Sequence, residues 1–247
     1  STGQRINSAK DDAAGLAITN VMTSNIRGLT QAVRNANDGI SMLQTAEGAM
    51  IEQTNMLQRM RELAVQAGTD TYNSAQRGYL QLEFSALTAQ IQNIATQTTW
   101  NGDNLLDQTN TAITSGNYDF LVGAASGQTI TVNIPKVTTS SSGLAISGES
   151  ISTASGAMSA LDAIDTALQS INEARATLGA GINQLTYAAD NLNNVIQNTT
   201  ASRSQILDTD YAVATTKLAS SQIIAQAATA MLAQANQSQQ GVLALLK

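Results

Sequence analysis

Two acidic pairs are the residues of this chain whose type and spacing come nearest to a metal site. Asp11 is followed by Asp12, and Asp208 stands two residues before Asp210. A calcium ion needs about six to eight oxygen ligands gathered in one place, and neither pair sits in a loop that supplies them. Carboxylates at the start of a helix are stabilised by the helix dipole, so we interpret both pairs as helix N-terminal acids.

Nucleophilic catalysis is equally poorly supported. Serine is abundant, but the chain has neither a His to act as its general base nor a Cys nucleophile. Imidazole and thiolate ligands for zinc are missing for the same reason. The run Gly179-Ala-Gly181 has no preceding strand and no Lys nearby, so it is not a phosphate-binding loop. We therefore predict that the protein is not an enzyme and that it has no cofactor and no metal ion.

The composition indicates a protein that associates with other protein. The 247 residues carry a net charge of −6, and only 12% of them are charged, against about 25% in typical soluble domains. Nucleic-acid binders need basic patches, so the acidic balance predicts no nucleic-acid partner. The most apolar stretch, residues 223–235, is too short and too interrupted by Gln to insert into a membrane. A polar but uncharged surface suits helices that pack against further protein.

Any functional side chain must be positioned by four segments of the chain. In each of them, apolar residues recur at alternating steps of three and four residues. This spacing predicts helices at about residues 9–67, 74–97, 152–206 and 211–246. Between the second and third, β-branched runs and turn residues over 113–150 predict one or two hairpins and a Ser/Thr/Gly-rich connection. The predicted fold class is mainly α: a long antiparallel coiled-coil or helical-bundle rod with a small β-hairpin insert.

The last predicted helix stands out because it has no charge from Leu218 to Leu246. Such a helix buries too little by itself to be stable in water, so we expect it to need a partner helix. Its apolar positions include the following residues: Ile224, Ala228, Met231, Val242 and Leu245.

Several long blocks of this sequence resemble the terminal regions of bacterial flagellins. The N-terminal blocks are Thr2–Gly15, Asn25–Ile40 and Leu57–Gln66; the C-terminal blocks are Leu192–Asn194, Asp208–Tyr211, Met231–Gln237 and Val242–Lys247. The similarity covers nearly all of the chain except about residues 108–150. The family's first few dozen residues are not in this sequence, so we expect an N-terminally truncated flagellin with little or no outer variable domain.

The resemblance implies a function in motility. Flagellins are exported through the flagellar channel and polymerise into the extracellular filament used for swimming. In the family, both termini form an inner coiled-coil domain, D0, and the adjoining segments form the rod-like domain D1. The expected organisation is then 1–107 as the N-terminal part of D1 with the residual D0/D1 junction at its start, 108–150 as hairpin and short insert, 151–207 as the C-terminal D1 helix, and 208–247 as the C-terminal D0 helix.

The partners implied by the resemblance are all proteins. They are further copies of the chain in a helical homopolymer, the flagellar export chaperone at the C-terminal helix, and the filament cap and hook-associated proteins. Ile224, Ala228, Met231, Val242 and Leu245 would serve polymerisation through the inner coiled coil. Toll-like receptor 5 of hosts is expected to recognise the monomer, through positions that match the family's receptor-binding residues: Gln58, Arg59, Leu63, Gln66 and Glu83.

Two alternatives remain open from the sequence. A hook–filament junction protein shares the terminal similarity. A monomeric receptor or carbohydrate-binding ectodomain on a coiled-coil stalk would need a binding surface within 108–150, where Tyr118 and Phe120 are the only aromatic residues.

Overall fold

The computed structural model describes residues 3–109 and 116–245, and of residues 237–245 it describes the backbone only. The helices in this part of the chain are α1 (Ala13–Gly68), α2 (Ser74–Gln97), α3 (Ala154–Leu207) and α4 (Tyr211–Leu245). Two small antiparallel strand pairs accompany them. The mainly α fold class with a β-hairpin insert is therefore confirmed. Residues 25–197 form one compact unit, and the segments 1–24 and 198–247 form another.

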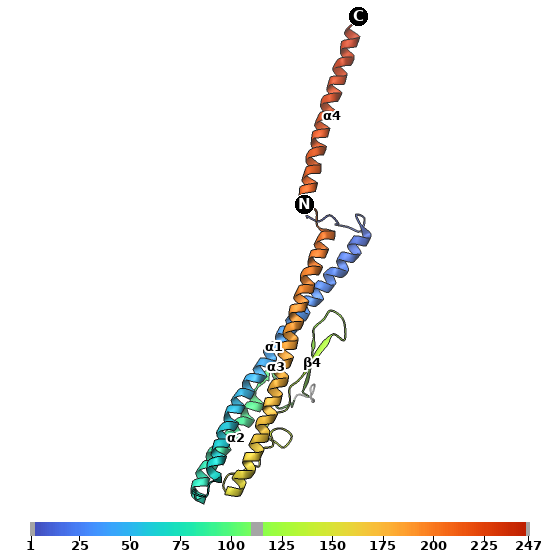
Figure 1. The fold of residues 1–247 in the computed structure, drawn as a ribbon. Coiled ribbons are helices and arrows are strands. Elements are labelled where there is room, and N and C mark those ends of the chain that lie inside the picture. Colours follow the sequence, from blue (N-terminus) through green and yellow to red (C-terminus); the bar gives the residue numbers. More distant parts are fainter. Residues whose placement is uncertain (1–2, 110–115, 246–247) are drawn as a thin grey trace. The chain divides into compact units, whose positions relative to one another are not determined.

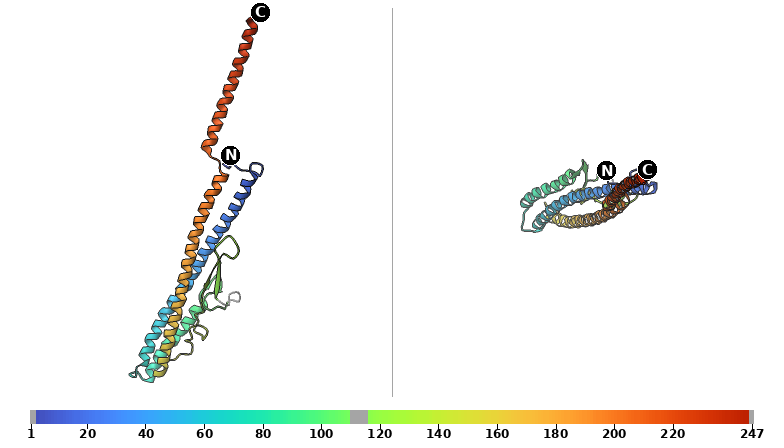
Figure 2. Two further views of the ribbon diagram at one scale, coloured as in Figure 1. Left: turned by 45° about the vertical axis from the view of Figure 1, so that its right-hand side comes forward. Right: turned by 90° about the horizontal axis from the view of Figure 1, so that it is seen from above.

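In the unit of residues 25–197, α1, α2 and α3 run side by side (Figures 1 and 2). The three-and-four spacing read from the sequence places one apolar row of each helix in a shared core. Its members include Leu43, Met50, Leu57 and Met60 of α1, Phe84 and Ile91 of α2, and Ile164, Ile171 and Leu178 of α3. Short apolar residues such as Ala160 and Ala174 fill the remaining core positions of α3.

Local side-chain caps set the helix ends. Asn73 and Gln76 form a reciprocal capping box at the start of α2. Asp12 accepts a hydrogen bond from the backbone N–H of Gly15 at 2.9 Å, so α1 begins at Ala13 and not near residue 9 as predicted. Asp210 caps α4 in the same way through Ala212. Asp208 differs from the prediction, because it follows the last residue of α3 and accepts a hydrogen bond from the Ser204 hydroxyl.

The predicted hairpin packs on the helices over glycines. Strands β3 (Asn117–Leu121) and β4 (Thr129–Asn133) pair antiparallel, with Phe120 opposite Ile130. A Cβ added to Gly39 of α1 would lie 2.7 Å from the Phe120 ring, and one added to Gly181 of α3 would lie 2.8 Å from Val132. These two glycines therefore let the hairpin approach the helix backbones closely.

A second, shorter strand pair lies directly after α2. Strands β1 (Thr99–Trp100) and β2 (Asp103–Asn104) are joined by Asn101 and Gly102, both with positive φ. Two consecutive positive φ values are typical of the type I′ turn that Asn-Gly favours. The turn places the Trp100 side chain against the core.

Three glutamines fix the connection between the hairpin and α3. Gln53 of α1 is buried and donates to the carbonyl of Val137 at 3.2 Å. From α2, Gln92 accepts the backbone N–H of Thr139 at 3.0 Å, and Gln81 accepts that of Ile151 at 2.6 Å. Side-chain amides thus satisfy main-chain groups of a segment that has no regular secondary structure.

Many helix hydroxyls are also satisfied inside the chain. They donate to the carbonyl four residues earlier, over distances of 2.7 to 3.0 Å: Thr30, Ser41 and Thr45 of α1, and Thr166, Ser170, Thr177 and Thr186 of α3. All of these residues lie on the exposed side of their helices. The donor of each hydroxyl is thereby occupied by its own helix.

The unit formed by segments 1–24 and 198–247 is held by backbone pairing between its two segments. The N–H of Arg5 donates to the carbonyl of Leu207 at 2.7 Å, and the N–H of Thr209 donates to the carbonyl of Gly3 at 3.0 Å. Ile6 is buried beside this pairing. None of the helices in the described part of the chain is apolar over a length that could cross a lipid bilayer.

Candidate protein–protein interfaces

Arg59 joins α1 to α2 on the surface of the three-helix unit. Its Nε atom donates to Oε1 of Glu83 at 2.8 Å, and its Nη1 atom donates to Oε2 of Glu62 at 2.9 Å. The hydrogen bond to Glu83 is the main reason that the pKa of Arg59 is raised, followed by the bond to Glu62. The structure thus brings together Arg59 and Glu83, which are 24 positions apart. Because both side chains are about half exposed, a partner can reach them.

Leu63 does not belong to this exposed surface. Its side chain is 1% exposed and packs in the core with Leu57 and Met60. Leu63 was expected to bind the receptor together with Arg59 and Gln66, but its side chain is not accessible for direct contact. Spacings of four and seven residues put these three side chains near one face of a helix, but α1 is covered on two sides. Contact with both α2 and α3 widens its buried face beyond a single row of residues.

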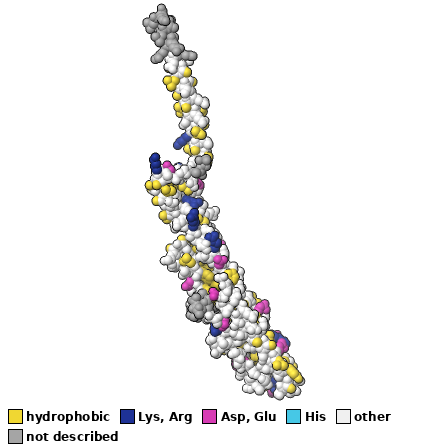
Figure 3. Space-filling model, turned by 180° about the vertical axis from the view of Figure 1, so that it is seen from behind, with side chains coloured by type: hydrophobic (Ala, Val, Ile, Leu, Met, Phe, Trp, Pro, Cys, Tyr) yellow, Lys and Arg dark blue, Asp and Glu magenta, His cyan; other side chains and the backbone are white. Residues whose placement is uncertain are grey.

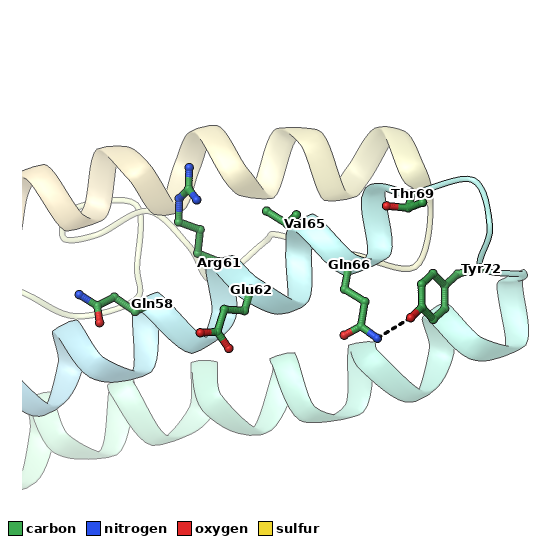
Figure 4. A pocket seen from close by; sticks show the side chains of 7 residues that line it. All are labelled: Gln58, Arg61, Glu62, Val65, Gln66, Thr69 and Tyr72. Atoms are coloured by element: carbon green, nitrogen blue, oxygen red, sulfur yellow. Dashed lines mark hydrogen bonds between the residues drawn. The ribbon is translucent and has the colours of Figure 1, made fainter.

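Gln58 and Gln66 line an open groove along α1 (Figure 4). The other residues of this α1 groove are Arg61, Glu62, Val65, Thr69 and Tyr72. Gln66 donates its side-chain N–H to the Tyr72 hydroxyl at 2.8 Å, which holds the loop after α1 against the helix. Val65 is 50% exposed and contributes apolar surface to the groove.

Arg61 and Asp165 connect α1 to α3 at the edge of this groove. Two parallel hydrogen bonds join them, Nε to Oδ1 at 2.7 Å and Nη2 to Oδ2 at 3.3 Å. The hydrogen bond from Arg61 is the largest cause of the lowered pKa of Asp165. The sequence did not indicate this pair, because no local pattern relates residues that are 104 positions apart.

Helix α4 presents the second candidate interface. Every side chain from Thr215 to Asn236 is exposed, including the apolar ones (Figure 3). Ile224 is 65% exposed and Met231 is 71% exposed, and Ala228 lies between them on the same face. Val242 and Leu245 belong to α4 as predicted, but their side chains lie outside the described residues.

The acidic pairs form no ion site in the described structure. Asp11 accepts two backbone N–H groups and the Ser8 hydroxyl, and the hydrogen bond from Ser8 is the main cause of its lowered pKa. Among the described residues, no group of three or more acidic, His or Cys side chains could hold a metal ion. Asp11, Asp12 and Asp210 instead accept hydrogen bonds from nearby backbone N–H groups, and Asp208 accepts one from the Ser204 hydroxyl.

Comparison with known proteins places the two ends of the chain in one family. Residues 1–111 match the bacterial flagellin N-terminal helical region, and residues 161–246 match the bacterial flagellin C-terminal helical region. A flagellin of Halalkalibacterium halodurans is 44% identical over all 247 residues of this chain, which cover 89% of that protein. The flagellar filament 33 kDa core protein of Treponema phagedenis is 40% identical, with 100% of this chain and 90% of that protein covered.

Solved structures agree with this assignment. The crystal structure of Bacillus cereus flagellin matches 64% of this chain and 88% of its own chain, with 34% sequence identity and a TM-score of 0.56. The names of these relatives are those of flagellar filament proteins, which are structural proteins. This chain therefore belongs to the bacterial flagellin family and is a structural subunit that polymerises into the flagellar filament.

Proposed function

We propose that α4 supplies the inner coiled coil through which the subunits polymerise. The observation that carries this proposal is that every side chain of α4 from Thr215 to Asn236 is exposed although the helix has no charge after Lys217, with Ile224, Ala228 and Met231 along one face. Exposed apolar surface of this extent favours a protein partner, and a second amphipathic helix would cover it by coiled-coil packing. Val242 and Leu245 would continue the same interface.

The same helix would bind the export chaperone before assembly. Export through the flagellar channel requires an unassembled chain, and a partner that covers α4 prevents premature polymerisation. The protein would then be secreted to the extracellular filament, where it meets the filament cap and the hook-associated proteins.

Two variants test both roles of α4. Ile224→Glu combined with Met231→Glu places charges in the proposed coiled coil, so electron microscopy is expected to show no filaments while the α-helical circular dichroism of the monomer remains. Deletion of residues 208–247 is expected to abolish chaperone binding in a pull-down assay. Normal filaments from the first variant, or unchanged binding by the second, would contradict the corresponding role.

We further propose that Toll-like receptor 5 recognises the monomer at Gln58, Arg59, Gln66 and Glu83. Support comes from the exposed Arg59–Glu83 pair, which places a guanidinium and a carboxylate side by side across α1 and α2. Arginine is frequent among residues that dominate binding energy. Leu63 would act from the core by maintaining the shape of α1 beneath these residues, and not by direct contact.

Alanine substitution of Arg59 tests the receptor proposal. Arg59→Ala is expected to weaken activation of a receptor-dependent reporter about tenfold or more, which corresponds to the roughly 1.4 kcal/mol or more that a binding hot spot contributes. Gln44→Ala is the matched control, because Gln44 is an exposed residue of the same helix. Equal activation by wild type and Arg59→Ala would refute the proposal.

A further inference from the structure

The methionines of this chain differ widely in how far solvent can reach them. Met50 and Met60 lie in the core with no exposed surface, and Met42 is only 5% exposed. By contrast, Met158 of α3 is 62% exposed and Met231 of α4 is 71% exposed. Oxidants convert an accessible thioether to a sulfoxide, so these two methionines are the candidates for oxidation in the folded chain.

Met231 stands among side chains that are too short to shield its thioether. Ala227 and Ala228 precede it by about one turn on the same face of α4, and Ala235 follows it by about one turn. All three are exposed, as Met231 is. The helix also carries no charge from Leu218 to Leu246, so its own side chains offer no ion to bind a polar group at this position. A small oxidant in solution therefore meets the sulfur without a steric barrier.

We propose that Met231 is an oxidation site of the unassembled subunit and that its sulfoxide blocks assembly through α4. The inference rests on the proposed polymerisation through this helix. The oxidant is hydrogen peroxide. An S–O bond forms as the O–O bond breaks, and the proton on the transferred oxygen passes to the leaving hydroxide, which becomes water. Sulfur loses two electrons and the peroxide gains them, so the reaction needs no other reactant.

A sulfoxide at position 231 conflicts with the apolar interface proposed for α4. Met231 lies two turns after Ile224 and shares its face with Ala228, so a partner helix that packs on this face encloses the Met231 side chain. Oxidation makes this flexible apolar side chain polar. A polar group that is buried without a hydrogen-bond partner is costly. Oxidation before assembly therefore prevents the coiled coil, whereas a coiled coil that has already formed protects the thioether.

Peptide mapping by mass spectrometry tests whether Met231 is the site. Full-length monomer and assembled filaments are treated with hydrogen peroxide under the same conditions. In the monomer, Met231 and Met158 are expected to oxidise at least about tenfold faster than Met50 and Met60, because the core methionines react only when the core opens. In the filament, oxidation of Met231 is expected to slow by a similar factor. Equal rates for Met231 and Met50 in the monomer would overturn the assignment of the site.

Assembly of the oxidised monomer tests the consequence. Electron microscopy is expected to show at least about tenfold fewer filaments after peroxide treatment, and methionine sulfoxide reductases are expected to restore them, because they reverse this modification. Met231→Leu keeps an apolar side chain of similar size and is expected to assemble equally well with and without peroxide. Met158→Leu is the matched control: it removes the other exposed thioether, on α3, and is expected to leave assembly as sensitive to peroxide as in the wild type.

Two results would overturn the effect on assembly. One is peroxide sensitivity that persists in Met231→Leu or disappears in Met158→Leu, because the responsible residue would then lie elsewhere. The other is a wild-type defect that the reductases do not reverse. The reductase measurement needs no substitution, so it decides the question even if a variant fails to assemble.

The filament measurement separates failure of this inference from failure of the proposed function. If Met231 is protected in the filament but monomer that carries its sulfoxide assembles normally, α4 is covered as proposed and only the inference is wrong. If Met231 oxidises equally fast in monomer and filament, assembly does not cover this face of α4, and both the inference and the proposed role of the helix are wrong.

Discussion

Arg59 and Arg61 stand two positions apart on α1, yet they connect it to different helices. Arg59 binds Glu83 of α2, and Arg61 binds Asp165 of α3. Residues two apart in a helix point in nearly opposite directions, so one short segment of α1 reaches both neighbours. Exposed ion pairs contribute little unless their geometry is good, and the two parallel hydrogen bonds between Arg61 and Asp165 are the more favourable case.

Replacement of Asp165 should change how stability depends on pH. The hydrogen bond from Arg61 lowers the pKa of Asp165 in the folded protein. The resulting stabilisation is present above the unfolded-state pKa of a carboxyl group and is lost as the pH falls through the lowered folded-state pKa. Asp165→Asn is therefore expected to lower the free energy of unfolding at about pH 6 and to change it little at about pH 2, measured by urea unfolding.

The matched control for this measurement is Asp162→Asn. Asp162 is an exposed carboxylate one turn earlier on α3, and it forms no ion pair with any described residue. Its substitution is expected to leave the difference between the two pH values close to that of the wild type. A pH dependence that is the same for Asp165→Asn and the wild type would show that the Arg61 contact does not stabilise the fold.

The sequence predicted which side chains of a helix are exposed only where that helix buries a single face. The sequence placed Arg59, Glu83 and Gln66 on the surface, where the structure has them. Leu63 was misplaced because its burial depends on both α2 and α3, which a single-helix pattern does not contain. The Arg61–Asp165 pair could not be predicted for the same reason, since the two residues meet only after the three helices have packed.

At the scale of elements, the helices could be predicted from the sequence, but the packing role of their glycines could not. Continuous apolar spacing gave α2 its observed ends at Ser74 and Gln97, with Asn73 as its cap. By helix propensity alone, Gly28, Gly39 and Gly48 are weak points of α1. In the structure Gly39 makes room for Phe120 of the hairpin, whereas Gly48 has no neighbour within 4 Å. The contact of Gly39 with a distant strand cannot be recognised from the local sequence pattern.

Alanine substitutions at these two glycines should have opposite effects. Gly39→Ala places a Cβ 2.7 Å from the Phe120 ring, and this overpacking is expected to lower the free energy of unfolding by about 1–3 kcal/mol. Gly48→Ala meets no neighbour and is expected to raise it by up to about 1 kcal/mol, through improved helix propensity. Urea unfolding followed by circular dichroism measures both. A stabilised Gly39→Ala variant would mean that the hairpin does not rest on this glycine.

At the scale of the whole molecule, the two units should differ in stability. The unit of residues 25–197 has a continuous apolar core, whereas side chains of α4 from Thr215 to Asn236 remain exposed. Helices without burial are marginally stable in water, and regions with few buried contacts open most easily. The fold class followed from the sequence because it depends on the spacing of apolar residues, but the difference between units depends on which faces remain uncovered.

Hydrogen exchange can measure this difference. In the monomer, amides of α4 are expected to exchange at least about 100-fold faster than those of the core positions of α1 and α3, because opening α4 exposes no buried surface. In the assembled filament the same amides are expected to slow by a similar factor, while the core amides change little. Equal protection of α4 in monomer and filament would show that assembly leaves this helix uncovered.

The hydroxyls that bond within α1 and α3 have a consequence for the water around the filament. A side-chain donor that is buried without a partner is costly, so a surface rich in Ser and Thr ordinarily resists drying. Here Thr30, Thr45 and Thr186 already give their protons to their own helices. Such a surface can lose its hydration layer without losing hydrogen bonds from these donors, and threonine methyl groups then become part of the contact area. A polar composition can in this way build contacts that stay dry in a filament bathed on all sides by water.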